Sequence, residues 1–319
     1  MKTALIFGIS GQDGSYLAKL LLKKNYKVYG VSRDLEASNL SNLYELNIFK
    51  DVEIFSATTS DLNSVMQALT KSNPDEIYNL SGQSSVSLSF DQPIETIESI
   101  IVGTQNLLDS IRLFNSKIKF YNACSTECFG NTGNNRATEK STFHPTSPYA
   151  IAKATSFWQV ANYREAYGIF ACSGILSNHE SPIRPERFVT QKIISAACRI
   201  SKGSKEILSL GNLEIFRDWG WAEEYVEGMW LMLQEIDPDD FIIATGETNS
   251  LKSFVERVFL NLDLDFNEHI KINHENFRPL DSKTSLVSPK KAEDILGWKA
   301  KTSFDLLIPK LIANKLNKV

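Results

Sequence analysis

Three glycines near the N-terminus constrain this chain more than any other feature. Gly8, Gly11 and Gly14 occur in the segment GISGQDG, between a short apolar run at residues 4–8 and a helical pattern of apolar residues at 16–21. Glycines let the backbone turn sharply and approach a pyrophosphate, and the N-terminus of the following helix supplies N–H donors and a positive dipole. Glycine turns alone are common, but this strand–turn–helix context predicts a dinucleotide cradle.

Strand-like and helix-like segments alternate through the first half of the chain. Helical patterns, notably at 63–70 and 97–113, separate short apolar runs at residues 4–8, 27–31, 52–55, 76–80 and 118–122. Strands that alternate with helices predict an α/β fold: a Rossmann-type doubly wound parallel sheet covered on both faces. Such a sheet binds its ligand at the carboxyl ends of its strands.

The alternation ends after residue 174, and irregular segments with scattered Pro, His and charged residues follow. Residues 222–234 and 241–245 have the patterns of a helix and a strand that return to the main sheet. We expect a smaller C-terminal substrate-binding lobe over the carboxyl edge of the sheet, where it would enclose a ligand. The predicted boundaries are 1–175 and 213–246 for the dinucleotide-binding domain, and 176–212 and 247–319 for the lobe.

Charge and cysteine content exclude several classes of function. The 34 basic and 38 acidic residues give a net charge of −4 without a basic stripe, so we expect no nucleic-acid partner. No apolar run is long enough to cross a bilayer, and the N-terminal apolar stretch is too short for a signal peptide. No metal-binding set surrounds the four cysteines, Cys124, Cys128, Cys172 and Cys198, so we expect no metal site. Free cysteines are typical of a reducing compartment, and we therefore expect a cytoplasmic protein.

The residues that follow the second predicted strand bear on the choice of cofactor. An acidic residue there would bind a ribose 2′-hydroxyl, whereas an arginine suits a 2′-phosphate. Ser32, Arg33 and Asp34 occupy this position, and because Arg33 comes first we expect NADP, while Asp34 leaves NAD open. Arg33 could instead be a solvated surface charge. Asp61 and Leu62, after the third strand, would suit the adenine amine and the ring face.

Tyr149 and Lys153 lie four residues apart in the segment SPYAIAK, a spacing that places both on one helix face. A tyrosine is a poor base at neutral pH, and a neighbouring ammonium would stabilise the phenolate and lower its pKa. Lys153 could also reach a nicotinamide ribose. Such pairs occur by chance in many helices. This pair follows the fifth strand of a sheet whose first strand ends in the glycine turn, and that context favours a catalytic role.

Ser125 and Glu127 come directly after the fifth predicted strand, and we expect them beside Tyr149 at the carboxyl edge of the sheet. A hydroxyl there can hydrogen-bond an oxygen that is being oxidised. Oxidation of an alcohol needs no carboxylate, whereas removal of a proton from carbon and expulsion of water do. The alternative is that Glu127 is a helix-capping or surface carboxylate.

Longer motifs resemble a known family over nearly the whole chain. With the glycine cradle, YNLSGQSSV (78–86), STE (125–127) and the Tyr–Lys pair resemble the extended short-chain dehydrogenases/reductases. The chain is further similar to the GDP-mannose 4,6-dehydratases in NYREAYG (162–168), NHESP (178–182), LGNLEIFRDWG (210–220), YVEGMWLMLQ (225–234), FRP (277–279) and KAEDILGW (291–298). The resemblance implies dehydration of a GDP-hexose with NADP.

The resemblance also implies a role for each matching position. Tyr149 would act at the sugar C4 hydroxyl, with Lys153 and Ser125 assisting, and Glu127 would remove the C5 proton as water leaves C6. The C4 hydride would return to C6, giving a 4-keto-6-deoxy sugar without net redox change. The implied cofactor contacts are Gly8, Ser10, Gly11, Gln12, Asp13, Gly14, Arg33, Asp61, Leu62, Leu80, Ser81, Gly82, Ser84, Tyr149, Lys153, His179 and Arg184. The implied substrate contacts are Ser84, Ser125, Glu127, Asn178, Val189, Lys192, Arg217 and Arg278.

Several positions depart from the family pattern. The family commonly has RRS where this chain has Arg33-Asp34-Leu35, SPRRGE where it has SPIRPE (181–186), and a tyrosine where it has Glu95. These changes leave the predicted chemistry intact but bear on the sugar and on subunit contacts. The chain also resembles the GDP-N-acetylglucosamine 4,6-dehydratases of bacterial legionaminic acid synthesis, and we favour that sugar slightly over GDP-mannose.

Two other functions must be weighed against dehydration. An epimerase or a 4-keto reductase would share the scaffold but would not need Glu127 as an elimination base. A cofactor-sensing protein without catalysis would be expected to lack one of the four catalytic side chains.

The resemblance implies a homodimer or homotetramer, in which the helix that carries Tyr149 packs against its copy; Phe157, Trp158, Val160 and Ala161 could form that face or belong to the core.

Overall fold

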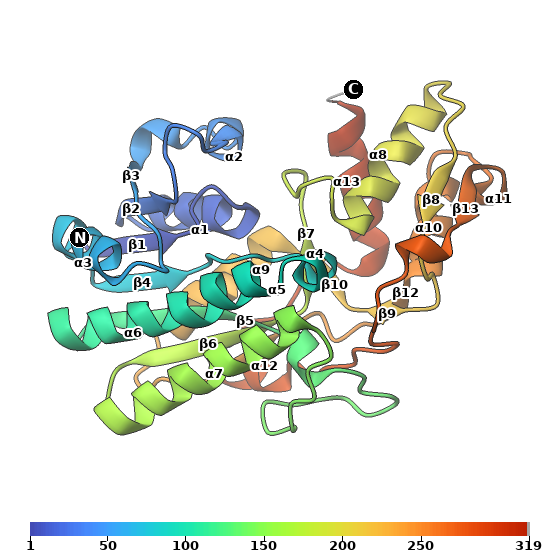
Figure 1. The fold of residues 1–319 in the computed structure, drawn as a ribbon. Coiled ribbons are helices and arrows are strands. Elements are labelled where there is room, and N and C mark those ends of the chain that lie inside the picture. Colours follow the sequence, from blue (N-terminus) through green and yellow to red (C-terminus); the bar gives the residue numbers. More distant parts are fainter. Residues whose placement is uncertain (318–319) are drawn as a thin grey trace.

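A seven-stranded parallel sheet forms the centre of the molecule (Figure 1), whose computed structural model describes residues 1–317. The strand order is β11-β6-β5-β4-β1-β2-β3, so the direction of winding reverses between β1 and β4. This reversal is the switch point at which doubly wound sheets bind ligands. The strands are β1 (Thr3–Phe7), β2 (Lys27–Ser32), β3 (Glu53–Ser56), β4 (Glu76–Asn79), β5 (Lys119–Ser125), β6 (Ala171–Leu176) and β11 (Phe241–Ile243).

Helices cover both faces of the sheet, and each face has its own apolar core. One core includes the buried side chains of Leu17 and Tyr225, and the other includes Leu69 and Leu107. The first set of helices is α1 (Gln12–Lys23), α9 (Ala222–Met232) and α12 (Lys290–Leu296); the second is α3 (Leu62–Ser72), α6 (Gly103–Phe114) and α7 (Pro148–Tyr167). The predicted doubly wound α/β class is confirmed.

Two segments differ from the predicted boundaries in ways that shape the site. Strand β5 continues past residue 122 to Ser125, which therefore ends the strand at the carboxyl edge of the sheet. The predicted helix 97–113 begins as a π-helical segment, η2 (Glu98–Val102), and becomes α-helical at Gly103. A Cβ at Gly103 would come within 2.6 Å of the Thr59 hydroxyl oxygen, so glycine permits this close approach. The preceding short helices are α4 (Val86–Asp91) and α5 (Pro93–Ile97).

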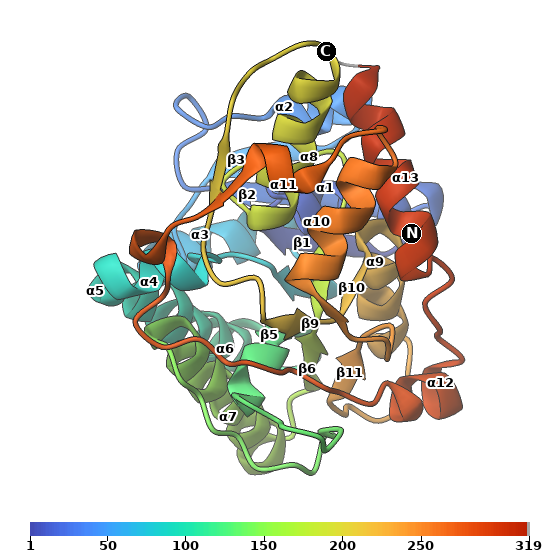
Figure 2. The same ribbon diagram turned by 90° about the vertical axis from the view of Figure 1, so that its right-hand side faces the viewer.

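A smaller lobe lies beyond the carboxyl edge of the sheet, on the right in Figure 1 and facing the viewer in Figure 2. Its mainly aliphatic core includes a cluster of aromatic rings: the Trp219 ring lies 5.4 Å from that of Phe254 and 5.9 Å from that of Phe304. The main helices are α8 (Val189–Ser201), α10 (Leu251–Leu260) and α13 (Phe304–Leu316). Three two-stranded pairings complete it: β8 (Leu208–Leu210) with β13 (Ile270–Ile272), β9 (Phe216–Arg217) with β12 (Asn249–Ser250), and β10 (Trp219–Trp221) with β7 (Asn178–Glu180).

The remaining elements are short. They are α2 (Ser41–Glu45), α11 (Phe266–His269) and the single turns η1 (Phe49–Asp51), η3 (Thr126–Phe129) and η4 (His274–Asn276). Helix α12 lies within the range 247–319 that we assigned to the lobe, yet it packs against α9 and β11 of the sheet domain. The division of the chain into two domains stays a prediction.

Candidate active site

The glycine turn after β1 is shaped by close backbone contacts. Gly8 has a φ of +87°, and a Cβ there would lie 2.6 Å from the Leu80 carbonyl oxygen. A Cβ on Gly14 would lie 2.2 Å from the Gly8 carbonyl oxygen. In the described part of the chain, no side chain caps helix α1, whose N-terminal N–H groups therefore face the turn. A backbone turn at an uncapped helix N-terminus fits a dinucleotide pyrophosphate.

Gly14→Ala should lower the free energy of unfolding by about 1–3 kcal/mol, because its methyl group would overlap the Gly8 backbone. Gly11→Ala is the matched control: Gly11 has a φ of −73°, and its Cβ would approach the Gly8 oxygen only to 3.3 Å. Thermal unfolding of both variants and the wild type measures the difference. Equal melting temperatures for the two variants would contradict this description of the turn.

His179 connects the glycine turn to strand β7. Its Nδ1 lies 2.7 Å from the Ser177 carbonyl oxygen, and its Nε2 lies 2.9 Å from Asp13 Oδ2, at the start of α1. Burial opposes ionisation of Asp13, but its interactions with His179, Gln12 and Arg184 together outweigh this effect, so the pKa of Asp13 lies below its usual value. Arg184 Nη1 donates to the His179 carbonyl oxygen at 2.5 Å. His179 and Arg184, both expected at the cofactor, thus make contacts within the protein that support the turn.

The other expected cofactor residues surround the same edge of the sheet. The loop 80–84 follows β4 and contacts Gly8; its Gly82 has a φ of +104°. Asp61 caps helix α3, where its side chain accepts the Asn63 N–H at 3.1 Å, and Leu62 is 39% exposed. Arg33 follows β2 and forms an ion pair with Glu95 on α5.

The end of β5 and the first turns of α7 bring the four expected catalytic side chains together. The Ser125 hydroxyl accepts the Glu127 N–H at 3.2 Å and also hydrogen-bonds the Tyr149 phenol. Ser147 caps α7 by accepting the Ala150 N–H at 3.1 Å, which positions Tyr149 in the first turn. Lys153 Nζ lies 5.9 Å from the centre of the Tyr149 ring.

The electrostatics of Tyr149 differ from the sequence-based expectation. Burial raises the pKa of Tyr149 well above its ordinary value, and the hydrogen bond from Ser125 only partly opposes this; the charge of Glu127 adds to the rise. Lys153 donates instead to the Ala123 carbonyl oxygen at 2.6 Å, and burial lowers its own pKa. The expected lowering of the phenol pKa by Lys153 is therefore wrong for the free protein, because Lys153 is desolvated and bonded elsewhere.

Glu127 belongs to a buried ionic network that sequence reasoning missed. Arg217 Nε, on β9, lies 3.3 Å from Glu127 Oε1, and Arg217 Nη2 lies 2.8 Å from Asp281 Oδ1. Asp281 also pairs with Arg278 Nη1 at 3.2 Å. Arg217 is 4% exposed, so its contact ties the expected elimination base to the smaller lobe. Only one feature of the sequence could have indicated this ionic network: Asp281 comes three residues after Arg278.

The remaining expected substrate residues lie along the edge of the lobe. Ser84 lies between β4 and α4, and Asn178 is the first residue of β7. Val189 begins α8, and Lys192, one turn further, donates to the Ser209 carbonyl oxygen at 2.8 Å. No hydrogen bond or ion pair among the described residues links Lys192 directly to Glu127. Its place in a substrate site stays a prediction.

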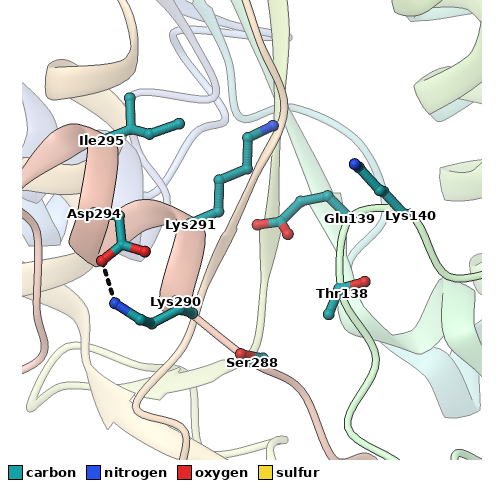
Figure 3. Close-up of a pocket in the computed structure, with 8 residues that line it drawn as sticks. All are labelled: Thr138, Glu139, Lys140, Ser288, Lys290, Lys291, Asp294 and Ile295. Carbon is teal, nitrogen blue, oxygen red and sulfur yellow. Dashed lines mark hydrogen bonds and ion pairs between the residues drawn. The ribbon is translucent and has the colours of Figure 1, made fainter.

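A cavity of about 480 Å³ lies outside this constellation, between the loop 138–140 and helix α12 (Figure 3). The side chain of Lys290 pairs with Asp294 on the same helix, and Lys291 lies opposite Glu139. None of its eight lining residues is an expected catalytic or binding residue. The cavity is therefore distinct from the candidate active site.

Two features of this Rossmann-type sheet define the extended short-chain dehydrogenase/reductase class. One is the glycine turn after the first strand, and the other is the Ser–Tyr–Lys group formed by the end of the fifth strand and the helix α7. A family model described as GDP-mannose 4,6 dehydratase matches residues 5–311. The chain is 42% identical to GDP-mannose 4,6 dehydratase 1 of Arabidopsis thaliana, over 99% of this chain and 90% of the relative. It is 40% identical to human GDP-mannose 4,6 dehydratase, over 97% and 90% of the two chains. The chain belongs to the GDP-mannose 4,6-dehydratase family.

Solved structures of more distant proteins share the fold. The chain aligns with a UDP-glucose 4-epimerase of Thermus thermophilus in complex with NAD, at a TM-score of 0.87 and 22% identity, over 99% of this chain and 100% of that one. It also aligns with a dTDP-glucose 4,6-dehydratase of Streptomyces venezuelae with NAD bound, at a TM-score of 0.87 and 19% identity, over 98% and 96%. At these identities the comparison shows the extended short-chain dehydrogenase/reductase fold alone.

Proposed function

We propose that this nucleotide-sugar 4,6-dehydratase converts a GDP-linked hexose to its 4-keto-6-deoxy derivative. Membership of the family and the convergence of Tyr149, Ser125 and Glu127 at one edge of the sheet support the proposal. The observation that carries it is the position of Ser125 at the end of β5, where its hydroxyl accepts the Glu127 N–H and hydrogen-bonds the Tyr149 phenol, so that all three groups can act on one sugar ring.

Each residue has a defined task in this reaction. Tyr149 takes the proton of the C4 hydroxyl, and Ser125 hydrogen-bonds the same oxygen. When bound, a nicotinamide dinucleotide supplies an acceptor for the C4 hydrogen and later a donor to C6. Oxidation at C4 acidifies the C5 proton; Glu127 removes it and passes it to the departing C6 hydroxyl, which leaves as water. A proton from solvent is added at C5 when C6 receives its hydrogen. Because Tyr149 has a raised pKa in the free protein, positive charge that arrives with the oxidised cofactor would favour its ionisation.

We propose NADP as the preferred cofactor and GDP-N-acetylglucosamine, ahead of GDP-mannose, as the substrate. Arg33 at the end of β2 supports a 2′-phosphate, and the departures from the family at residues 34, 35, 95, 183 and 185 support a changed sugar. Incubation with GDP-mannose, GDP-N-acetylglucosamine, and UDP- and dTDP-hexoses, followed by mass spectrometry for loss of one water, tests the function. Turnover of a UDP- or dTDP-sugar alone would overturn the guanine assignment.

We also propose that the protein acts in the cytoplasm. The four cysteines are free and buried in the structure, which is typical of proteins in a reducing compartment. Among residues 1–317, no helix is long and apolar enough to cross a membrane.

We propose that the enzyme assembles through helix α7, and Trp158→Glu should convert the assembly to monomers. Trp158 is 63% exposed, and Ile151, two turns earlier on the same face, is 49% exposed. The adjacent α5 exposes Ile94, which enlarges the apolar surface. Light scattering after size-exclusion chromatography measures the change. Leu260→Glu, on α10 of the other lobe and 72% exposed, is the control that should leave the assembly intact. A monomeric wild type would contradict the proposal.

A further inference from the structure

An ion pair joins the end of strand β2 to helix α5, two elements that are distant in sequence. Arg33 directly follows the last residue of β2, and its Nη1 lies 2.9 Å from Glu95 Oε1. The side chain of Arg33 is 79% exposed and that of Glu95 is 46% exposed. Both charged groups are therefore open to solvent and to a ligand at the carboxyl edge of the sheet.

Asp34, the other charged residue at this strand end, is engaged in its own loop. Its Oδ1 accepts the N–H groups of Glu36 at 3.0 Å and Ala37 at 3.2 Å. A carboxylate with these two bonds stabilises a turn. Glu95 instead supplies a carboxylate beside Arg33, from a different part of the chain.

Hydrogen bonds connect the backbone around Glu95 to the loop that follows β4. The Gln83 side chain donates from Nε2 to the Thr96 hydroxyl at 3.2 Å, and the Gln83 N–H donates to the Ser99 hydroxyl at 3.2 Å. The Ser99 hydroxyl in turn donates to the Glu95 carbonyl oxygen at 2.7 Å. Since the loop 80–84 contacts the glycine turn, Glu95 has a defined position relative to the cofactor cradle.

We propose that Glu95 weakens the preference of this protein for NADP over NAD by competing with a 2′-phosphate for Arg33. This inference rests on the proposed function, in which Arg33 faces the adenosine ribose. A 2′-phosphate carries negative charge and must displace Glu95 or share Arg33 with it, at the cost of repulsion between like charges. A 2′-hydroxyl meets no such repulsion and can donate to a carboxylate. Glu95 therefore narrows the preference for NADP over NAD that Arg33 alone would create.

Dissociation constants of NADPH and NADH, measured by fluorescence titration of the purified protein at low ionic strength, test the inference. Glu95→Gln should bind NADPH about fivefold more tightly, the scale of one exposed ion pair, with NADH binding unchanged or slightly weaker. The gain should shrink in high salt. Glu98→Gln, which removes an equal charge three residues further on, should leave the ratio of the two constants unchanged. In the Arg33→Gln background, Glu95→Gln should no longer tighten NADPH binding.

The outcomes separate this inference from the proposed function. If the wild type binds both dinucleotides and Glu95→Gln leaves their ratio as it was, the role of Glu95 is overturned and the dehydratase proposal stands. An equal gain in Glu98→Gln would also overturn it, because the effect would then be one of net charge. If the wild type binds neither dinucleotide, the proposed function itself fails, and this inference with it.

Discussion

Glu127→Gln should lose dehydration by about 10²- to 10⁴-fold while it still binds dinucleotide and GDP-hexose. The amide keeps the size of the side chain but cannot accept the C5 proton. The variant should still oxidise C4, because Tyr149 and Ser125 are unchanged. Mass spectrometry of the sugar product measures water loss, and titration calorimetry measures binding.

Asp281→Asn is the matched control for this variant. Arg217 contacts both carboxylates, at 3.3 Å to Glu127 and 2.8 Å to Asp281, so either substitution leaves the same guanidinium with one fewer partner. If catalysis depended only on the charge balance around Arg217, both variants would lose activity equally. We expect Asp281→Asn to retain dehydration. Wild-type turnover by Glu127→Gln would remove this carboxylate from the mechanism.

Tyr149→Phe should lower the rate by a similar factor, about 10²- to 10⁴-fold, but at an earlier step. Without the phenol no group takes the C4 proton, so the variant should not reduce bound cofactor when substrate is added. Absorbance of the reduced nicotinamide under single-turnover conditions distinguishes this block from that of Glu127→Gln.

Tyr163→Phe, on the same helix α7, controls for loss of a phenol. Its hydroxyl donates to Asp109 Oδ1 at 2.6 Å, and Tyr163 lies almost four turns along α7 from Tyr149, so its removal should change stability but not the oxidation step. Reduction of the cofactor by Tyr149→Phe at the wild-type rate would contradict the assignment of Tyr149 as the base.

Local sequence patterns predicted the elements that build the cradle and the catalytic helix. The glycine spacing predicted the turn, because Gly8 and Gly14 stand where a side chain would meet backbone. The four-residue spacing of Tyr149 and Lys153 predicted a shared helix face. Alternation of strands and helices predicted that Ser125 would lie at the carboxyl edge, although β5 is longer than expected.

Contacts between distant segments could not be read from these patterns. The approach of Arg217 to Glu127 depends on how β9 of the lobe packs over the end of β5, and no local periodicity encodes that. The pairing of Arg33 with Glu95 depends likewise on the placement of α5. The raised pKa of Tyr149 follows from its burial, which only the folded protein creates.

Turnover of the GDP-hexose in D₂O tests most directly whether Tyr149 and Glu127 act on one ring. Removal of the C5 proton and its replacement from solvent should leave deuterium at C5 of the 4-keto-6-deoxy product, detected by NMR and mass spectrometry. Product formed with protium retained at C5 would contradict elimination through Glu127, and with it the joint action of the two side chains on one sugar.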